Sequence, residues 1–270
     1  MRALLLSAGL GTRLKPLTDL LPKCLVPING RPLLDFWLEN LFSQGIEDIL
    51  VNTHYRASLV REYLARSTWS GLVKLVHEER LLGTGGTLVA NRDFFSGHRV
   101  LLIHADNLTR FNCRDFIAAH EQRPAGTALT MMLFHTSNPR SCGIVELDSA
   151  GIVQGFHEKV DNPPGDLANA AVYILEPEVL QFIASLERAE VDFSTEVIPY
   201  FVGRIFTYLN DDYHRDIGTV ASWREAQDDF SMPSALPENH AAWAQLTAPM
   251  ACELERLAHG LREIRTDSKS

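Results

Sequence analysis

Glycine and basic residues directly follow the first apolar run of the chain. Gly9 and Gly11 end that run, and Thr12 and Arg13 come next. Glycine has no Cβ and tolerates positive φ, so successive backbone N–H groups in such a loop can surround a phosphate. Lys23, held between two prolines, adds a second positive charge. The pattern predicts a phosphate-binding loop, for which a tight strand–helix turn with a surface lysine is the simpler alternative.

A carboxylate, Asp106, follows the apolar stretch Arg99–His104. Open α/β sheets gather their ligand-binding groups at the carboxyl ends of the strands. The position of Asp106 therefore predicts a role in binding a ligand or a metal. A helix N-cap or a turn is the alternative for an aspartate at this place.

Motifs of several other enzyme classes are absent from the sequence. A dinucleotide fingerprint would need a third glycine where Leu14 stands, and no Walker loop, HExxH or GxSxG run occurs. The cysteines form no CxxC pair and have no regular spacing, which argues against a zinc site, a redox pair or a disulfide framework. These four cysteines are Cys24, Cys113, Cys142 and Cys252.

The charge of the chain is distributed unevenly. The whole sequence carries a formal charge of −9, whereas residues 1–31 contain five Lys and Arg residues and one Asp, a net charge of +4. An acidic protein does not attract a nucleic-acid backbone by its overall charge, and a local basic region favours a small anionic ligand. The first apolar run is broken by Ser7 and Gly9, which argues against a signal peptide, and no run reaches the length of a membrane span. We expect a cytoplasmic protein with no nucleic-acid or membrane partner.

Strand-length apolar runs alternate with segments of helical period in the first half of the chain. This alternation predicts a doubly wound α/β fold. The expected strands are Ala3–Ser7, Asp48–Thr53, Leu72–Val76 and Arg99–His104, and the expected helices are Pro32–Ser43, Ala57–Ala65, Gly86–Asn91 and Asn112–Gln122.

Beyond residue 126 the pattern favours mixed or antiparallel strands with few helices. The expected strands are Thr127–Phe134, Gly143–Leu147, Gly151–Phe156, Ala170–Leu175 and Arg204–Leu209, and the expected helices are Pro177–Leu186, Thr195–Phe201 and Thr219–Phe230. Residues 1–230 are predicted to form one domain, and residues 231–270 a helical extension with a frayed tail at Thr266–Ser270. The extension is expected either to cap its own domain or to contribute to a homodimer contact.

The long segment Leu4–Leu38, LLLSAGLGTRLKPLTDLLPKCLVPINGRPLLDFWL, resembles the signature of the sugar-1-phosphate nucleotidyltransferases. Later segments resemble that family in the same order, so the resemblance covers about residues 1–229. These segments are Leu82–Thr87, Leu102–Asn107, Cys142–Glu146, Glu158-Lys159, Asn169–Tyr173 and Asp216–Thr219. The resemblance implies a Rossmann-like three-layer sandwich with a mostly parallel central sheet and a small mixed or antiparallel extension on the sugar side.

The family reaction joins a nucleoside triphosphate to a sugar 1-phosphate and releases pyrophosphate, so these two molecules are the implied partners. The resemblance implies catalytic roles for Arg13 and Lys23, and a Mg²⁺ site at Asp106 and Asp216. It implies nucleotide binding by Ala8, Gly9, Gly11, Thr12, Arg13, Glu78, Gly83, Gly86 and Asp106. It implies sugar-phosphate binding by Gly143, Glu158, Lys159 and Asn169.

The second glycine segment, LLGTGGTL, looks most like that of guanylyltransferases acting on mannose-type or heptose-type 1-phosphates, which favours GTP. A uridylyl- or thymidylyltransferase for a hexose 1-phosphate is the close alternative. A catalytically silent nucleotide-sugar-binding regulator and a cytidylyltransferase for a non-sugar phosphate remain open. Two departures from the family pattern are Ala105, where glycine is usual, and Cys142, where an aromatic residue is common.

Overall fold

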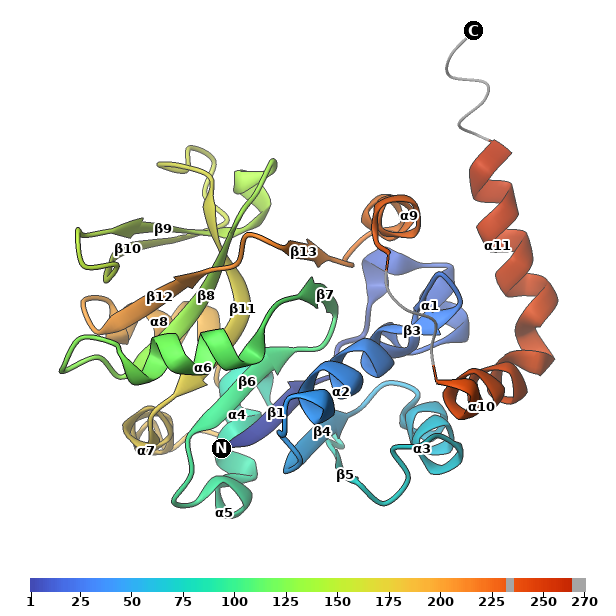
Figure 1. The fold of residues 1–270 in the computed structure, drawn as a ribbon, viewed down its shortest axis with the longest axis horizontal. Coiled ribbons are helices and arrows are strands. Elements are labelled where there is room, and N and C mark those ends of the chain that lie inside the picture. The colour runs from blue at the N-terminus through green and yellow to red at the C-terminus, as the bar shows by residue number, and fades with distance from the viewer. Residues whose placement is uncertain (232–235, 264–270) are drawn as a thin grey trace, which may run out of the picture.

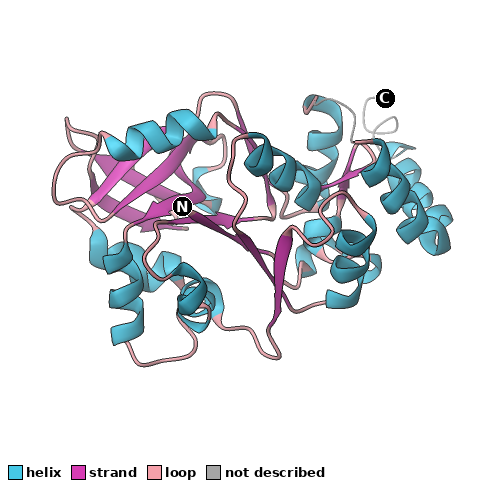
Figure 2. Ribbon diagram, turned by 60° about the horizontal axis from the view of Figure 1, so that its bottom comes forward, coloured by secondary structure: helices cyan, strands magenta, loops and turns pink. Residues whose placement is uncertain are grey.

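A computed structural model describes residues 1–231 and 236–263 of the chain. Its centre is a nine-stranded sheet with helices on both faces (Figures 1 and 2). Four parallel strands form the half that follows the N-terminus, in the order β5-β4-β1-β6. They are β1 (Arg2–Leu6), β4 (Ile49–Thr53), β5 (Val73–His77) and β6 (Val100–His104). Because the chain runs outward from β1 in both directions, the carboxyl ends of β1 and β6 flank a switch point where a ligand can bind.

Mixed pairing, antiparallel except between one pair of strands, extends the sheet beyond β6, as the sequence predicted. The strand β11 (Leu167–Leu175) pairs with β6 and with β8 (Leu129–His135), and β12 (Ile205–Leu209) pairs in parallel with β8. An irregularity between Asn169 and Tyr173 includes Ala171, whose φ is +54°. The first half of β11 thereby reaches β9 (Gly143–Leu147), which forms a hairpin with β10 (Val153–Glu158).

Alternate side chains of each strand enter two separate hydrophobic cores, which gives the three-layer arrangement. Ala3 and Leu5 of β1 face one core, and Leu4 faces the other. The first core is covered by α2 (Leu33–Ser43), α3 (Ala57–Arg66), α6 (Cys113–Glu121) and α10 (Pro237–Thr247). The second is covered by α4 (Gly83–Ala90), α5 (Arg92–Phe95), α7 (Pro177–Ser185), a π-helical turn at Phe193–Val197 and α8 (Ile198–Phe201).

Two short antiparallel pairs lie outside the main sheet, and the sequence analysis did not predict either. The hairpin of β2 (Pro27–Ile28) and β3 (Arg31–Pro32) follows the basic loop. The strand β7 (Asn107–Arg110) pairs with β13 (Tyr213–Asp216) over a separation of about a hundred residues. In that register Asp216 lies opposite Asn107, the residue after Asp106.

Several predicted boundaries were wrong. The strand expected from Ala170 begins at Leu167, and the helix expected at Thr195–Phe201 begins as a π-helical turn at Phe193.

Two other boundaries differ for local reasons. The strand expected from Gly151 begins at Val153, because Gly151 has a φ of +75° in the turn that starts at Asp148. The helix expected from Gly86 begins at Gly83, so the second glycine segment is itself helical.

The remaining elements are helices and 3-10 turns, several of them in or beside the basic loop. They are α1 (Leu17–Leu20), α9 (Val220–Asp229), α11 (Ala251–Glu263) and 3-10 turns at Thr12–Leu14, Lys23–Leu25, Pro139–Ser141 and Ala248–Met250. A third core joins apolar side chains of this loop to α9 and α11. Figure 1 shows α10 and α11 at the end of the molecule that carries α3 and α1.

The extension predicted for residues 231–270 is attached to the domain through a buried polar contact. Asn239 of α10 donates from Nδ2 to Asp35 Oδ1 at 2.8 Å, and its Oδ1 accepts from the backbone N–H of Thr68 at 2.8 Å. Trp243 packs edge-on against Tyr63 of α3. The tail predicted at Thr266–Ser270 lies outside the described residues. Across the ranges that the structure describes, no helix is both long and apolar enough to cross a membrane.

Candidate active site

Three charged side chains from distant parts of the sequence meet beside the carboxyl end of β6. Lys23 Nζ lies 2.5 Å from Asp106 Oδ2 and 3.4 Å from Asp216 Oδ1. Lys23 belongs to the 3-10 turn Lys23–Leu25, Asp106 follows β6, and Asp216 ends β13. The pairing of β7 with β13 is what brings Asp216 to Asp106. The sequence predicted all three residues for one site, and the structure places them in direct contact.

The electrostatics of this group favour the charged forms of Lys23 and Asp106. Burial alone would lower the pKa of Lys23, but the carboxylates of Asp106 and Asp216 outweigh it and raise that pKa above its ordinary value. Burial alone would raise the pKa of Asp106, and the Lys23 ammonium outweighs it and lowers that pKa. The Lys23 side chain is 9% exposed, so its charge is held in place rather than solvated.

The two carboxylates fit a divalent metal that is shared with a substrate. Both converge on one cation, the Lys23 ammonium, and carboxylate oxygen is the ligand that Mg²⁺ prefers. Within residues 1–231 and 236–263, no group of three or more His, Cys, Asp or Glu side chains could hold a metal by itself. The donor set therefore fits Mg²⁺ bound by one or two carboxylates together with substrate phosphates.

Of the two glycines of the basic loop, Gly11 has a conformation that requires glycine, whereas Gly9 has no positive φ and nothing near the place of a Cβ. Gly11 has a φ of +62°, and a Cβ there would lie 2.7 Å from Thr18 Cγ2, so no other residue fits without strain. Thr18 Oγ1 donates to the Gly11 carbonyl at 2.7 Å. Thr12 and Arg13 are exposed at the start of the following turn. Arg13 Nη2 approaches Gly218, two residues after Asp216, which brings the guanidinium to the same end of the site.

A cavity of about 200 Å³ adjoins the charged group. Five of the predicted nucleotide-binding residues line it, and they are Ala8, Gly9, Glu78, Gly83 and Asp106. The other lining residues are Leu6, Asn52, Leu81, Thr84, Thr87, His104 and Asp192. The cavity lies at the carboxyl ends of β1, β4 and β6, where the strand order places a ligand.

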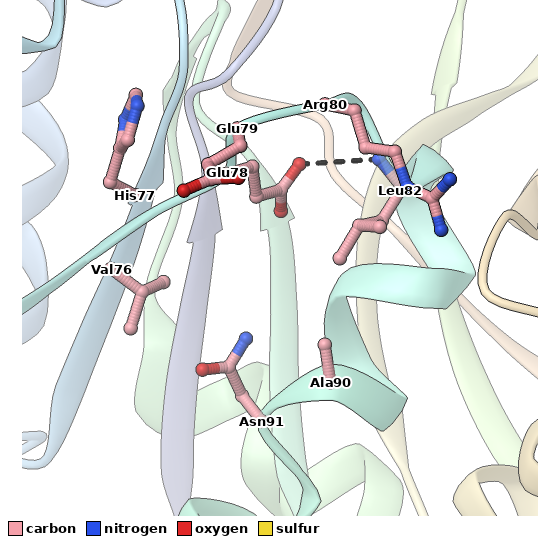
Figure 3. A pocket seen from close by; sticks show the side chains of 8 residues that line it. All are labelled: Val76, His77, Glu78, Glu79, Arg80, Leu82, Ala90 and Asn91. Atoms are coloured by element: carbon pink, nitrogen blue, oxygen red, sulfur yellow. Dashed lines mark hydrogen bonds between the residues drawn. The ribbon is translucent and has the colours of Figure 1, made fainter.

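Glu78 lines this cavity and organises its surroundings through hydrogen bonds. Its Oε1 accepts from Asn52 Nδ2 at 2.8 Å and from Thr87 Oγ1 at 2.6 Å, and its Oε2 accepts from the backbone N–H of Leu82 at 3.3 Å. Figure 3 shows the hydrogen bond between Glu78 and Leu82. Both residues also line a second, wider pocket of about 700 Å³ beside β5. Glu78 thus fixes the start of α4 against the end of β4.

The second glycine segment is glycine-rich because another backbone segment lies against it. The N–H of Gly85 donates to the Val191 carbonyl at 2.8 Å, and the N–H of Val191 donates to the Leu82 carbonyl at 3.0 Å. A Cβ at Gly83 would collide with the backbone of Val191, and one at Gly86 with the backbone of Ala189. Gly83 also lines the cavity, whereas Gly86 is not among its lining residues.

The predicted sugar-side residues form a second group on β9, β10 and β11. Gly143 lies opposite Glu158, and a Cβ at Gly143 would lie 2.5 Å from Glu158 Oε2. Lys159 Nζ lies 2.9 Å from Glu158 Oε1, and the Lys159 side chain is 65% exposed. Asn169 Nδ2 donates to the Tyr173 hydroxyl at 2.7 Å.

Comparison with known proteins places this arrangement in a family. The model of the family described as "Nucleotidyl transferase" matches residues 2–231. The chain belongs to the nucleotidyl transferase family. The match covers the glycine loop, Lys23, both aspartates and the sugar-side group of residues.

Relatives of this nucleotidyl transferase differ in the nucleotide that their names state. The chain is 31% identical over 222 residues to mannose-1-phosphate guanylyltransferase of Mycobacterium tuberculosis, covering 80% of this chain and 61% of that protein. It is 29% identical over 232 residues to glucose-1-phosphate thymidylyltransferase of Streptomyces griseus, covering 83% and 64%. The chain thus spans about three fifths of the length of these curated relatives.

A solved structure confirms the fold. A Bacillus anthracis protein in complex with a sucrose superposes with a TM-score of 0.78 at 20% identity, covering 87% of this chain and 98% of that one.

The sequence analysis of this nucleotidyl transferase missed several polar residues that line the cavity. His104 lies inside the quoted segment Leu102–Asn107, but no property of the segment distinguished it from a strand residue. In the sequence, Asn52 and Thr87 had the pattern of ordinary strand and helix residues, and Asp192 that of a loop residue. The signal that could have found Asn52 is its polarity inside an otherwise apolar strand of ILVNT.

Proposed function

We propose that this chain transfers a nucleoside monophosphate from a nucleoside triphosphate to a sugar 1-phosphate and releases pyrophosphate. The observation that carries the proposal is the contact of Lys23 with Asp106 and Asp216 beside the glycine loop. Such a group neutralises phosphate charge, and the raised pKa of Lys23 keeps its amine protonated and therefore not nucleophilic, which suits a direct in-line displacement at phosphorus. The family match supports the same reaction class.

Each residue of the site has a role in this scheme. The backbone of Gly9 and Gly11 would bind the triphosphate, and Arg13 would contact the leaving pyrophosphate. Lys23 would stabilise the charge that develops on the α-phosphate as the sugar phosphate oxygen attacks. Asp106 and Asp216 would hold Mg²⁺, which supplies charge neutralisation on the phosphate oxygens when bound.

On the sugar side, Glu158 would accept hydrogen bonds from sugar hydroxyls and Lys159 would contact the phosphate of the second substrate. Their ion pair of 2.9 Å, with the lysine largely exposed, leaves the ammonium able to turn toward an incoming phosphate. Gly143 and Asn169 would shape the sugar pocket.

GTP is the proposed nucleotide, and mannose 1-phosphate is the first sugar phosphate to test. The guanylyltransferase-like segment LLGTGGTL and the relative from Mycobacterium tuberculosis support this choice. A thymidylyl- or uridylyltransferase acting on glucose 1-phosphate is the second candidate, which relatives with those names favour.

Free cysteines at all four positions support a reducing, cytoplasmic location. A homodimer stays a prediction, which sedimentation of the whole chain would test.

A matrix assay tests the proposal. Each of the five triphosphates (GTP, UTP, dTTP, ATP and CTP) is incubated with mannose, glucose and heptose 1-phosphates and Mg²⁺, and pyrophosphate release is measured. We expect one nucleotide to dominate and turnover to stop when Mg²⁺ is chelated. Release of pyrophosphate without any sugar phosphate, or no release with any pair, would contradict the proposal.

A further inference from the structure

The polar side chains that line the cavity are almost all used by the protein itself. Asn52 accepts from the backbone N–H of Ser7 at 2.7 Å and donates to Glu78 at 2.8 Å. Glu78 accepts hydrogen bonds at both carboxylate oxygens, and Thr87 donates to it at 2.6 Å. These residues therefore have little hydrogen-bonding capacity left for a ligand.

His104 is one of two exceptions, the other being Asp192. The Nε2 of His104 is buried and has no hydrogen-bond partner, and neither ring nitrogen is bonded to any residue for which the structure gives a position. An imidazole normally has at least one partner when it is enclosed, because a buried unpaired polar atom costs about 1–3 kcal/mol. An unpaired histidine in a ligand cavity therefore indicates a partner that arrives with the ligand.

His104 lies between the two halves of the proposed site. It is the last residue of β6, opposite Leu6 of β1, and it precedes Asp106 by two residues. Its ring centroid lies 6.4 Å from that of Tyr173, whose hydroxyl accepts the hydrogen bond from Asn169. His104 thus links the phosphate-binding end of the cavity to the sugar-side group.

Asp192 supplies a complementary acceptor in the same cavity. Its Oδ1 caps the helical turn that follows, accepting from the backbone N–H of Thr195 at 2.8 Å and from Thr195 Oγ1 at 2.9 Å. Its Oδ2 has no hydrogen-bond partner in the part of the chain that the structure covers. A hydroxyl group, which both donates and accepts, matches a neutral imidazole and a carboxylate that line one cavity.

We propose that His104 is a specificity-determining residue that hydrogen-bonds a ring hydroxyl of a sugar, either the ribose of the nucleoside triphosphate or the ring of the sugar 1-phosphate. The inference rests on the proposed function. A role as general base does not fit that reaction, because the attacking phosphate oxygen is already an anion and has no proton to remove. A role in binding the proposed Mg²⁺ fits poorly, because Mg²⁺ prefers oxygen ligands to an imidazole nitrogen.

Three substitutions test the contact. His104→Phe keeps the ring and removes both nitrogens, His104→Gln places a polar atom near the Nε2 position, and His104→Asn places one near Nδ1. His98→Phe is the matched control, because His98 lies at the opposite end of β6, two residues before the strand begins. Thermal unfolding of each variant confirms that the fold is retained.

The readout is discrimination against deoxy substrates. The kcat/KM values for GTP, 2′-deoxy-GTP and 3′-deoxy-GTP are compared, as are those for mannose 1-phosphate and its monodeoxy analogues. We expect His104→Phe to lose about tenfold in kcat/KM for the substrate whose hydroxyl it binds, and to lose nothing for the analogue without that hydroxyl. Loss of discrimination among nucleotides identifies the ribose, and loss among sugar phosphates identifies the second substrate. Rescue by His104→Gln or His104→Asn identifies the nitrogen.

Equal discrimination by wild type and His104→Phe for every analogue would overturn the inference while leaving the proposed function intact. The same ligands are also titrated calorimetrically against the free protein, so that the contact is measured without turnover. If the wild type releases no pyrophosphate but the deoxy ligands still bind more weakly than their parents only when His104 is present, the proposed function fails and the hydroxyl contact stands. If none of the ligands binds, both fail.

Discussion

Replacing Lys23 with methionine should change metal binding and turnover in opposite directions. The ammonium holds Asp106 and Asp216 at 2.5 and 3.4 Å in the ligand-free protein, and these are the carboxylates assigned to the metal. A metal can bind both carboxylates only when those two ion pairs open. Lys23→Met removes this competition and keeps most of the aliphatic side chain.

The size of the effect follows from the geometry. Two unit charges 4 Å apart attract by about 1 kcal/mol in a water-like dielectric, so two such pairs oppose metal binding by about 2 kcal/mol. Lys23 is only 9% exposed, so this water-like value is the lower bound. Metal affinity of the nucleotide-free protein should therefore rise by about tenfold or more, since 1.4 kcal/mol corresponds to a factor of ten. Turnover should fall by about 10²–10³, the range for removal of one charge-stabilising donor.

Titration of the free protein with Mn²⁺, followed by the loss of its paramagnetic resonance signal, measures the first effect, and pyrophosphate release with Mg²⁺ measures the second. Lys15→Met is the matched control. Lys15 belongs to the same loop, lies 3.2 Å from Asp19 and is 61% exposed, so its replacement should alter neither quantity much. Unchanged or weaker Mn²⁺ binding by Lys23→Met would refute the reasoning that ammonium and metal compete for one pair of carboxylates.

Three further predictions concern other parts of the site. Asp106→Asn should nearly abolish Mg²⁺-dependent turnover without unfolding the protein, and full activity in chelator would refute the metal assignment. Lys159→Ala should raise the KM for the sugar phosphate, and Arg13→Ala should weaken the triphosphate. Calorimetric titration with each substrate, using a non-hydrolysable triphosphate for the ternary complex, would refute this division if both variants weakened the triphosphate equally. Gly86→Ala should lower the free energy of unfolding by about 1–3 kcal/mol through collision with the Ala189 backbone, which denaturant titration measures; an unchanged midpoint would contradict the packing described.

The parts of the site that sequence reasoning reached are those fixed by local chemistry. Gly11 adopts a positive φ, and Asp106 ends an apolar strand, so residue type and immediate context determine each of them. The alternation of apolar runs likewise predicted β1, β4, β5 and β6 within two residues at each end, because β1, β4 and β6 are mostly buried and β5 keeps apolar residues at three of its five positions. Lys23 was singled out by its charge between two prolines and Asp216 was assigned by resemblance, and their mutual contact could not be deduced from either segment alone.

The features that sequence reasoning missed depend on distant segments. The pairing of β7 with β13 joins short, partly polar strands about a hundred residues apart. Neither the sequence of β7 (NLTR) nor that of β13 (YHRD) indicates which strand it pairs with. The glycines of the second segment were assigned to the nucleotide, whereas Gly86 makes room for the backbone of residue 189. A sequence shows that a Cβ is missing but does not show what occupies the space. His104 was missed because a sequence does not show that a buried ring nitrogen has no hydrogen-bond partner.

The apolar residues beneath the charged group explain why its three members stay together. Leu14 and Leu17 of the basic loop, Leu108 of β7 and Ile217 after β13 share one core with Trp223 of α9, and Leu257 of α11 completes it. Each of Lys23, Asp106 and Asp216 is therefore within a few residues of a buried anchor in the same or an adjoining core. The family match ends at residue 231, yet Leu257 is only 8% exposed because it packs against these anchors. α11 thus adds the buried side chain of Leu257 to the core that supports the basic loop, whereas the other buried members of that core lie within the family match.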